Sequence, residues 1–361
     1  MTIESKPLSS KQKASSETDP DQLEGAPHPR DRHVLFGQDE AEQEFLRAFA
    51  SGRLHHAWLI GGPQGVGKAT LAYRIAKFVL AHGAGSQPLA ESLAVSPAAP
   101  ASRQVAALSH PNLFVLRRQP ATEKKVATSN IPVDQVRRAL GLFAITAGDS
   151  GYRICIVDSA EDLAAPSANA LLKMVEEPPP RSLFLIISHA PQRVLPTIRS
   201  RCRRLLLKPL GEGDLTSVIA SLGEDAHDPS DVARAVALAD GSARRAIELL
   251  DPAKAETIEA VNRLLDGLPR FDVKASLAVA ERLSKKGSEQ DFELALESVQ
   301  RWASMILNRK AMEGPARLAP LVEVCEKIAR SAREVDIYNL DRRPLVLTMF
   351  GDLADAVRAT E

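Results

Sequence analysis

Continuous apolar runs separated by helical patterns organise the first 210 residues. Runs without polar alternation, typical of strands buried on both faces, lie at 57–60, 113–116, 153–158 and 183–187. Apolar residues at helical spacing, with prolines marking one start and one end, predict helices at 37–50, 69–81, 133–143 and 166–177. This order predicts an α/β domain whose parallel sheet is covered by helices on both faces.

The pattern changes after Pro209, where only helical periodicity remains. Gly211 and Gly213 indicate a hinge there, and 83–107, rich in Ala, Ser and Pro, predicts an irregular insertion with at most one short helix. We expect a disordered tail at 1–31, an α/β domain at 32–209, a small helical domain at 210–265 and a last helical domain at 266–361.

Composition narrows the classes of function. The 46 basic and 46 acidic residues cancel, so binding of nucleic acid through net charge alone is not expected. Aromatic residues make up only 4%, which argues against a protein that stacks single-stranded bases. Cysteines 155, 202 and 325 have neither zinc nor disulfide spacing, and neither a signal peptide nor a long apolar run is visible. We expect a reduced, cytoplasmic protein that does not contact a membrane.

A phosphate-binding loop follows the first predicted strand. Gly62, Gly65, Gly67 and Lys68 have the P-loop spacing, and they lie between a strand and a helix as the mechanism requires. Backbone N–H groups of such a loop cradle phosphate oxygens, and the lysine reaches the terminal phosphates. ATP is therefore the candidate ligand.

Two positions that hydrolysis needs are altered. Ala69 stands where a Ser or Thr hydroxyl would ligate Mg²⁺, and Thr70 is turned about 100° around the helix from that place. Asp158 ends a predicted strand and can hold the water shell of the metal, but Ser159 replaces the Glu that would orient the attacking water. Glu161 is expected to point elsewhere on the turn. Because losing a general base costs on the order of 10² to 10⁴ in rate, we predict weak or absent turnover.

Further segments of this chain resemble the bacterial AAA+ clamp-loader family of DNA polymerase III. They are the approach to the loop at 54–63, Ala-Asn-Ala-Leu-Leu-Lys with Glu-Glu-Pro-Pro at 168–179, Ser-Arg-Cys within 197–202, and Gly-Ser-Ala-Arg at 241–244. The similarity extends from about residue 37 to about residue 250. It implies a AAA+ P-loop nucleotide fold with a parallel sheet, a small helical lid and an all-helical C-terminal collar domain that oligomerises.

The resemblance also implies a role for each matching residue. Asp158 matches the Walker B acid, and Ser188 matches the sensor 1 position at the end of its strand. Arg201 matches an arginine finger, which acts in trans on ATP held by the adjacent subunit. Arg244 matches sensor 2 of the lid, which touches nucleotide phosphates. Together with the loop and Thr70, these residues form the candidate nucleotide-binding set, and no residue is assigned to a resident metal.

Plainer interpretations stay open for several of these residues. Arg201 belongs to the basic cluster at 199–204, which could form a solvated or DNA-facing edge. Arg244 adjoins Arg245, and an arginine on a helix surface is commonplace. Asp158 taken alone could simply cap the turn that follows its strand.

The resemblance implies partners as well. They are gamma/tau and delta subunits in a hetero-pentamer, the beta sliding clamp, and primer-template DNA reached through the complex. Members of the family often carry a four-cysteine zinc module after the P-loop, but 83–107 contains no cysteine, so no zinc is expected. Positions 69 and 159 favour a member that hardly hydrolyses ATP. The resemblance implies a subunit of the polymerase holoenzyme that is not itself the polymerase. The alternatives are an active gamma/tau-like ATPase and an interaction module with an inherited loop.

Overall fold

The chain divides into two compact units, with the boundary between Leu210 and Gly211. The structure, a computed structural model, describes residues 23, 25–83, 90–119, 128, 130–144, 151–223, 227–310, 315–338 and 340–360. Most of the expected tail therefore lies outside the described residues, although Pro29–Asp31 form the short 3-10 helix η1 and His28 is buried.

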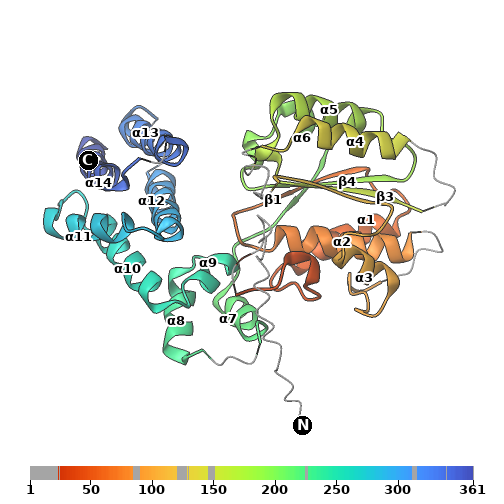
Figure 1. Ribbon diagram of the computed structural model, residues 1–361, viewed down its shortest axis with the longest axis horizontal. Coiled ribbons are helices and arrows are strands. Elements are labelled where there is room, and N and C mark those ends of the chain that lie inside the picture. Colours follow the sequence, from red (N-terminus) through yellow and green to blue (C-terminus); the bar gives the residue numbers. More distant parts are fainter. Residues whose placement is uncertain are drawn as a thin grey trace, which may run out of the picture. The chain divides into compact units, whose positions relative to one another are not determined.

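The first unit is built on a parallel sheet (Figure 1). Its strands are β1 (Ala57–Gly61), β2 (Leu113–Arg117), β3 (Arg153–Asp158), β4 (Ser182–Ser188) and β5 (Arg203–Leu206). Over the described residues they lie in the order β2-β3-β4-β1-β5, and all of the pairings are parallel. Gly61 is therefore level with Ser188 on one side and with Leu206 on the other.

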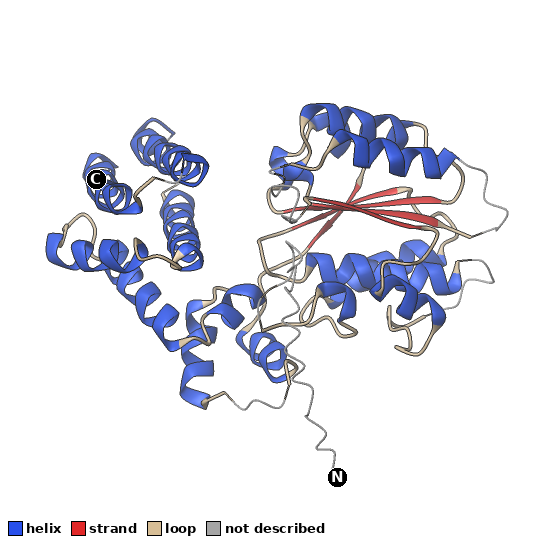
Figure 2. Cartoon of the chain, viewed as in Figure 1, coloured by secondary structure: helices blue, strands red, loops and turns tan. Residues whose placement is uncertain are grey.

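Helices cover both faces of this sheet, as the sequence predicts (Figure 2). They are α1 (Asp39–Ala50), α2 (Lys68–His82), α3 (Pro100–Ala106), α4 (Val133–Ala144), α5 (Ala165–Glu176) and α6 (Pro196–Arg199). Helices α1 to α3 lie on one face and α4 to α6 on the other. Successive side chains of β1 accordingly enter different cores: Trp58 packs on the α1 and α2 side, whereas Leu59 packs on the other side.

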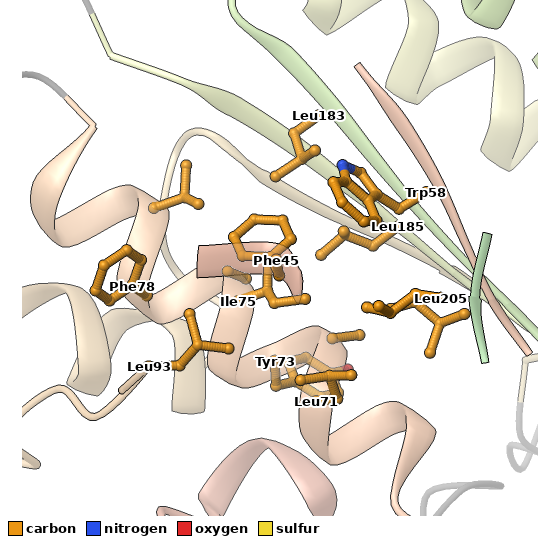
Figure 3. Packing of buried hydrophobic residues seen from close by; sticks show 14 of the residues in the cluster. Phe45, Trp58, Leu71, Tyr73, Ile75, Phe78, Leu93, Leu183, Leu185 and Leu205 are labelled. Atoms are coloured by element: carbon orange, nitrogen blue, oxygen red, sulfur yellow. The ribbon is translucent and has the colours of Figure 1, made fainter. Parts of the chain in front are cut away.

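The core beneath α1 and α2 fixes the helix that carries the phosphate loop (Figure 3). Leu71 of α2 is fully buried there, and the ring of Phe45 of α1 packs against Trp58 at a tilt of 55°, with 5.2 Å between the ring centroids. Phe78 of α2 lies edge-on to Phe49 at 5.1 Å. Burying these aromatic and aliphatic side chains stabilises the unit by roughly 1.5 to 3 kcal/mol each, which holds α2 firmly against β1.

β5 is the one strand of the sheet that the sequence does not predict. Its residues are Arg203, Arg204, Leu205 and Leu206, and only Leu205 is buried. Because β5 lies at the edge of the sheet, most of its side chains stay in solvent, and its apolar signal is short.

The insertion after α2 is held without cysteine ligands. It contains one short helix, α3, as predicted, and residues 84–89 lie outside the described part. Leu93 is buried in the core, and its N–H donates to the carboxylate of Glu42 on α1. The same carboxylate pairs with Arg74 of α2 at 3.1 Å, and both side chains are nearly inaccessible to solvent.

The second unit is helical in its described residues. Its helices are α7 (Glu212–Ala220), α8 (Pro229–Leu238), α9 (Ala243–Glu248), α10 (Pro252–Asp266), α11 (Val273–Leu283), α12 (Glu289–Arg309), α13 (Pro315–Tyr338) and α14 (Arg342–Thr360). The carboxylates of Asp228, Asp251 and Asp272 cap the first turns of α8, α10 and α11.

One apolar cluster unites this second unit. It contains Ala235 and Leu249 of the expected lid together with Ile258, Val299 and Phe350. The further division near residue 265 therefore stays a prediction. Among the helices that the structure describes, we find none with the length and hydropathy of a membrane span.

Replacing Glu42 tests the anchoring of the insertion. Glu42→Ala leaves Arg74 buried and uncompensated, so the free energy of unfolding of the first unit should fall by about 3 to 5 kcal/mol. Urea denaturation followed by tryptophan fluorescence measures the loss, with Trp302 of the second unit replaced by Phe so that Trp58 alone reports. The matched control is Glu44→Ala, which removes a partly exposed pair with Arg203 and should cost at most about 1 kcal/mol. Equal losses in the two variants would contradict the anchoring.

Candidate nucleotide site and arginine finger

The phosphate loop connects the carboxyl end of β1 to the start of α2. Gly62 has a φ of 146°, and a Cβ there would lie 2.6 Å from the carbonyl oxygen of Leu207. Gly67 caps α2 with a φ of 98°. A side chain is excluded at both positions by strain, and at Gly62 by the backbone beside it as well. The loop therefore has the glycine-dependent geometry that leaves backbone N–H groups accessible to an anion.

Lys68 folds back onto its own loop. Its ammonium donates to the carbonyl oxygen of Gly62 at 2.8 Å and to that of Pro63, and the residue is 4% exposed. Burial lowers the pKa of Lys68 to about 8, although the carboxylates of Asp158 and Glu161 act in the opposite direction. An incoming phosphate would restore the charge that burial disfavours.

Gln38 ties the loop to the edge of the sheet. Its buried amide donates to the carbonyl oxygens of Lys208, at 2.8 Å, and Val66, at 3.2 Å. The N–H of Lys208 donates back to the amide oxygen at 3.3 Å. The side chain of Gln38 thus connects the phosphate loop to the segment that follows β5. The sequence does not predict this contact, because a single Gln before a helix is common.

Asp158 and Ser188 lie at the same edge of the sheet as the loop. Asp158 ends β3 and Ser188 ends β4, the strand between β3 and β1. Since the strands are parallel, their carboxyl ends converge with the loop. Ser159 is buried and donates to the carboxylate of Asp162 at 3.3 Å, whereas Ala69 and Thr70 lie in the first turn of α2.

The expectation for Glu161 is wrong. It lies in the 3-10 helix η2 (Ala160–Asp162), and its side chain is directed back toward the end of β4. Its carboxylate accepts from the Ser188 hydroxyl at 2.5 Å and from the N–H of Ala190 at 2.8 Å. Burial alone would raise the pKa of Glu161, but these hydrogen bonds outweigh it and lower that pKa.

Arg201 lies at the opposite edge of the sheet. It lines an open depression of about 590 Å³ together with His55, His56, Val175, Glu176 and Glu177. The two histidines directly precede β1, so the depression marks the amino ends of the strands. β1 has 5 residues at a rise of about 3.3 Å each, which places this edge roughly 16 Å from the start of the phosphate loop.

The guanidinium of Arg201 is oriented but accessible. It pairs with Glu176 at 2.9 Å and donates to the carbonyl oxygen of Thr197 at 3.0 Å. The side chains of Arg201 and Glu176 are 40% and 39% exposed, so the pair contributes little to stability. The neighbouring Arg203 is instead engaged by Glu44 and by the Trp58 ring, 4.9 Å from its guanidinium. The basic cluster is thus not one uniform solvated edge.

Arg244 belongs to the second unit and is surrounded by acids. Its guanidinium pairs with Glu248 at 3.1 Å, Glu293 at 3.7 Å and Glu297 at 4.0 Å. Arg245 beside it is almost fully buried and donates to the Ser298 hydroxyl at 2.7 Å. Both arginines therefore join α9 to α12 within their own unit.

The parallel sheet with helices on both faces is a P-loop nucleotide fold of the AAA+ class. The phosphate loop, Asp158 and Ser188 lie together at one edge of that sheet. The loop and Lys68 are the groups that would hold the phosphates of a nucleotide, whereas Ala69 offers no hydroxyl to a magnesium ion at the usual place. Among the residues that the structure describes, no group of three or more His, Cys, Asp or Glu side chains could hold a metal ion.

Comparisons with known proteins narrow this class. The sequence profile described as DNA polymerase III, delta subunit, matches residues 37–211. A DNA polymerase III subunit delta' of Pseudomonas aeruginosa is 38% identical over 162 residues, which are 44% of this chain and 46% of that protein. A gamma/tau subunit of Mycobacterium tuberculosis is 31% identical over 194 residues, 53% of this chain and 31% of that protein. Over residues 37–211, this chain is therefore similar to the clamp-loader subunits of DNA polymerase III.

The chain spans about half of the length of the first relative and about a third of the second. A solved gamma subunit-related protein of Thermotoga maritima aligns with 86% of this chain and 99% of its own at 16% identity. The TM-score of that alignment is 0.38.

The lowered pKa of Lys68 predicts a dependence of stability on pH. The ordinary value of 10.5 applies to the unfolded chain, and about 8 applies to the folded one. Between these values the unfolded state binds more protons, so the free energy of unfolding rises with pH, by up to about 3 kcal/mol. Urea denaturation at pH values below, within and above this window measures the rise. In Lys68→Met the rise should be absent.

Lys208→Met is the matched control for Lys68→Met. Lys208 is an exposed lysine that pairs with Glu40, so its loss should leave the pH dependence of the wild type in place. An unchanged pH dependence in Lys68→Met would show that burial does not lower the pKa of Lys68.

Proposed function

We propose that this chain is the delta-prime subunit of a bacterial DNA polymerase III clamp loader and supplies Arg201 to the ATP site of a neighbouring subunit. One observation carries the proposal. Arg201 lies at the amino edge of the sheet, whereas the phosphate loop lies at the carboxyl edge. A guanidinium so placed cannot reach a nucleotide in its own loop, so a nucleotide phosphate that replaces Glu176 as its partner would be held by another chain.

The chemistry of Arg201 follows from its charge. In phosphoryl transfer, negative charge spreads over the oxygens of the transferred group, and a guanidinium offers paired N–H donors to them. The bond to the carbonyl oxygen of Thr197 keeps the side chain oriented. Phosphate oxygens carry more charge than the Glu176 carboxylate and can displace it from an exposed pair worth at most about 1 kcal/mol.

The chain's own loop has a different role in this proposal. Gly62 to Lys68 would hold the phosphates of ATP, which is the candidate ligand, by backbone N–H groups and the ammonium. A bound magnesium ion would supply charge neutralisation at the phosphates. Ala69 gives that ion no hydroxyl, and Ser159 is a weak base already bonded to Asp162. Binding with weak or absent hydrolysis follows.

The partners of the chain are proposals as well. The named relatives are delta' and gamma/tau subunits, which supports assembly with gamma/tau and delta subunits in a hetero-pentamer. Such an assembly would place the beta sliding clamp on primer-template DNA, and the chain would reach both through the complex. The chain would act as a subunit of the polymerase holoenzyme and would not itself add nucleotides to DNA.

The proposal predicts a loss of ATPase activity in trans. In a reconstituted loader, Arg201→Ala in this chain should lower ATP hydrolysis at the neighbouring site by about 10³-fold or more, because the transition-state charge loses its donor. Clamp- and DNA-stimulated ATPase measures the loss, and gel filtration confirms assembly.

Arg204→Ala is the matched control for Arg201→Ala. Arg204 is an exposed arginine of the same basic cluster that does not line the depression, and its replacement should leave the ATPase of the loader unchanged. An intact complex whose ATPase is unaffected by Arg201→Ala would reject the role in trans.

An active gamma/tau-like ATPase is the second candidate, which the intact loop and the gamma/tau relatives favour. We expect the isolated chain to hydrolyse ATP at least about 10²-fold more slowly than an active gamma/tau-like subunit assayed beside it. Equal steady-state rates would establish the second candidate instead.

A further inference from the structure

The hydroxyl of Ser188 is already committed to a partner in its own chain. The residue is fully buried, and a serine has a single hydroxyl proton to donate. That proton goes to Glu161 at 2.5 Å, while the same oxygen accepts from the N–H of Ala190 at 3.2 Å. Ser188 therefore cannot donate to a phosphate until Glu161 releases it.

Glu161 also brings negative charge to the place where phosphates would bind. Its carboxylate and that of Asp158 are near enough to Lys68 to favour the charged form of the lysine. Phosphate oxygens held by the loop and by Lys68 would face this carboxylate in a partly buried site. Like charges there repel by more than they would in water, since the effective dielectric constant is lower.

We propose that Glu161 is an internal competitor of the nucleotide: it holds the sensor hydroxyl of Ser188 and places its own charge where terminal phosphates would lie. The inference rests on the proposed nucleotide-binding role of the loop. It adds a residue that limits the affinity of that loop for ATP. Occupation of this site by ATP then requires the Ser188–Glu161 hydrogen bond to break.

A helpful role for Glu161 is the opposing possibility, because a carboxylate near position 159 could replace the missing general base. The hydrogen bonds argue against it. One oxygen of the carboxylate accepts from both Ser188 and the N–H of Ala190. A carboxylate stabilised in its charged form by two donors is a poorer base, and it is anchored to the end of β4 instead of being directed at a water molecule.

The test measures ATP affinity of the full chain by isothermal titration calorimetry with Mg²⁺ present. Glu161→Ala removes both the competing acceptor and the charge, and Glu161→Gln removes the charge in the same shape. We expect each variant to bind ATP about tenfold more tightly than the wild type, as the loss of a charge-assisted hydrogen bond or a like charge implies. Asp134→Asn, which changes an exposed carboxylate of α4, should bind like the wild type.

A second background separates the two effects of Glu161. In the Ser188→Ala background there is no hydroxyl to release. The fold-increase in ATP affinity caused by Glu161→Ala should therefore be at least about threefold smaller in that background than in the wild type. Thermal unfolding confirms that each variant folds, and Glu161→Gln retains the shape of the site if Glu161→Ala does not fold.

Several results would overturn the inference. They are unchanged affinity in Glu161→Ala and Glu161→Gln, weaker ATP binding, or a loss of whatever turnover the chain has, since the last two would make Glu161 a ligand or a base. Failure of every variant to bind ATP would equally remove Glu161 as the barrier. None of these results bears on Arg201, whose effect is read at a neighbour's site, so the two proposals fail independently.

Discussion

The parallel pairing of β1 with β4 and β5 is the constraint on which both candidate sites depend. In a parallel sheet every strand ends at the same edge, so the loop after β1, Asp158 and Ser188 meet without any specific attraction between them. The same constraint places Arg201, which lies two residues before the start of β5, at the other edge. One backbone arrangement thus makes a phosphate site on one edge and an exposed arginine on the other.

The polar groups of the phosphate site are largely satisfied by their own chain. Lys68 bonds to loop carbonyls and Ser188 to Glu161. Buried donors without partners cost about 1 to 3 kcal/mol each, so these bonds let the site persist without a nucleotide. The same bonds must break before phosphates can take their place. Stability without a ligand and the low affinity that we propose would therefore have one physical cause.

Arg201 differs from the polar groups of the phosphate site, because its partner within the chain is exposed and easily exchanged. Its ion pair with Glu176 is solvent-exposed, and exposed pairs exchange partners at little cost. The guanidinium is oriented by a backbone carbonyl and only weakly neutralised. It can therefore exchange Glu176 for a phosphate group on a neighbouring subunit. Arg244 differs again, because three carboxylates of its own unit share its charge.

The sequence predicts much of the fold because local signals agree there. Continuous apolar runs identify β1 to β4, and the glycine spacing identifies the phosphate loop. β5 has no such signal, since an edge strand keeps its arginines in solvent. Glu161 was placed wrongly because the direction of its side chain is set by Ser188 and Ala190, which lie 27 and 29 positions further along the chain.

Several partners of Gln38 and Arg244 could not be predicted from the sequence, because they lie far away along the chain. Gln38 reaches a carbonyl 170 positions away, and no local pattern records such a partner. The acids around Arg244 likewise come from a different helix as well as its own.

The most direct measurement is the structure of the assembled loader with a non-hydrolysable ATP analogue bound to the subunit beside this chain. We expect the guanidinium of Arg201 to have left Glu176 and to lie within hydrogen-bond distance of the terminal phosphate of that analogue. An analogue bound at the neighbouring site while Arg201 still pairs with Glu176 and faces solvent would contradict its role in trans.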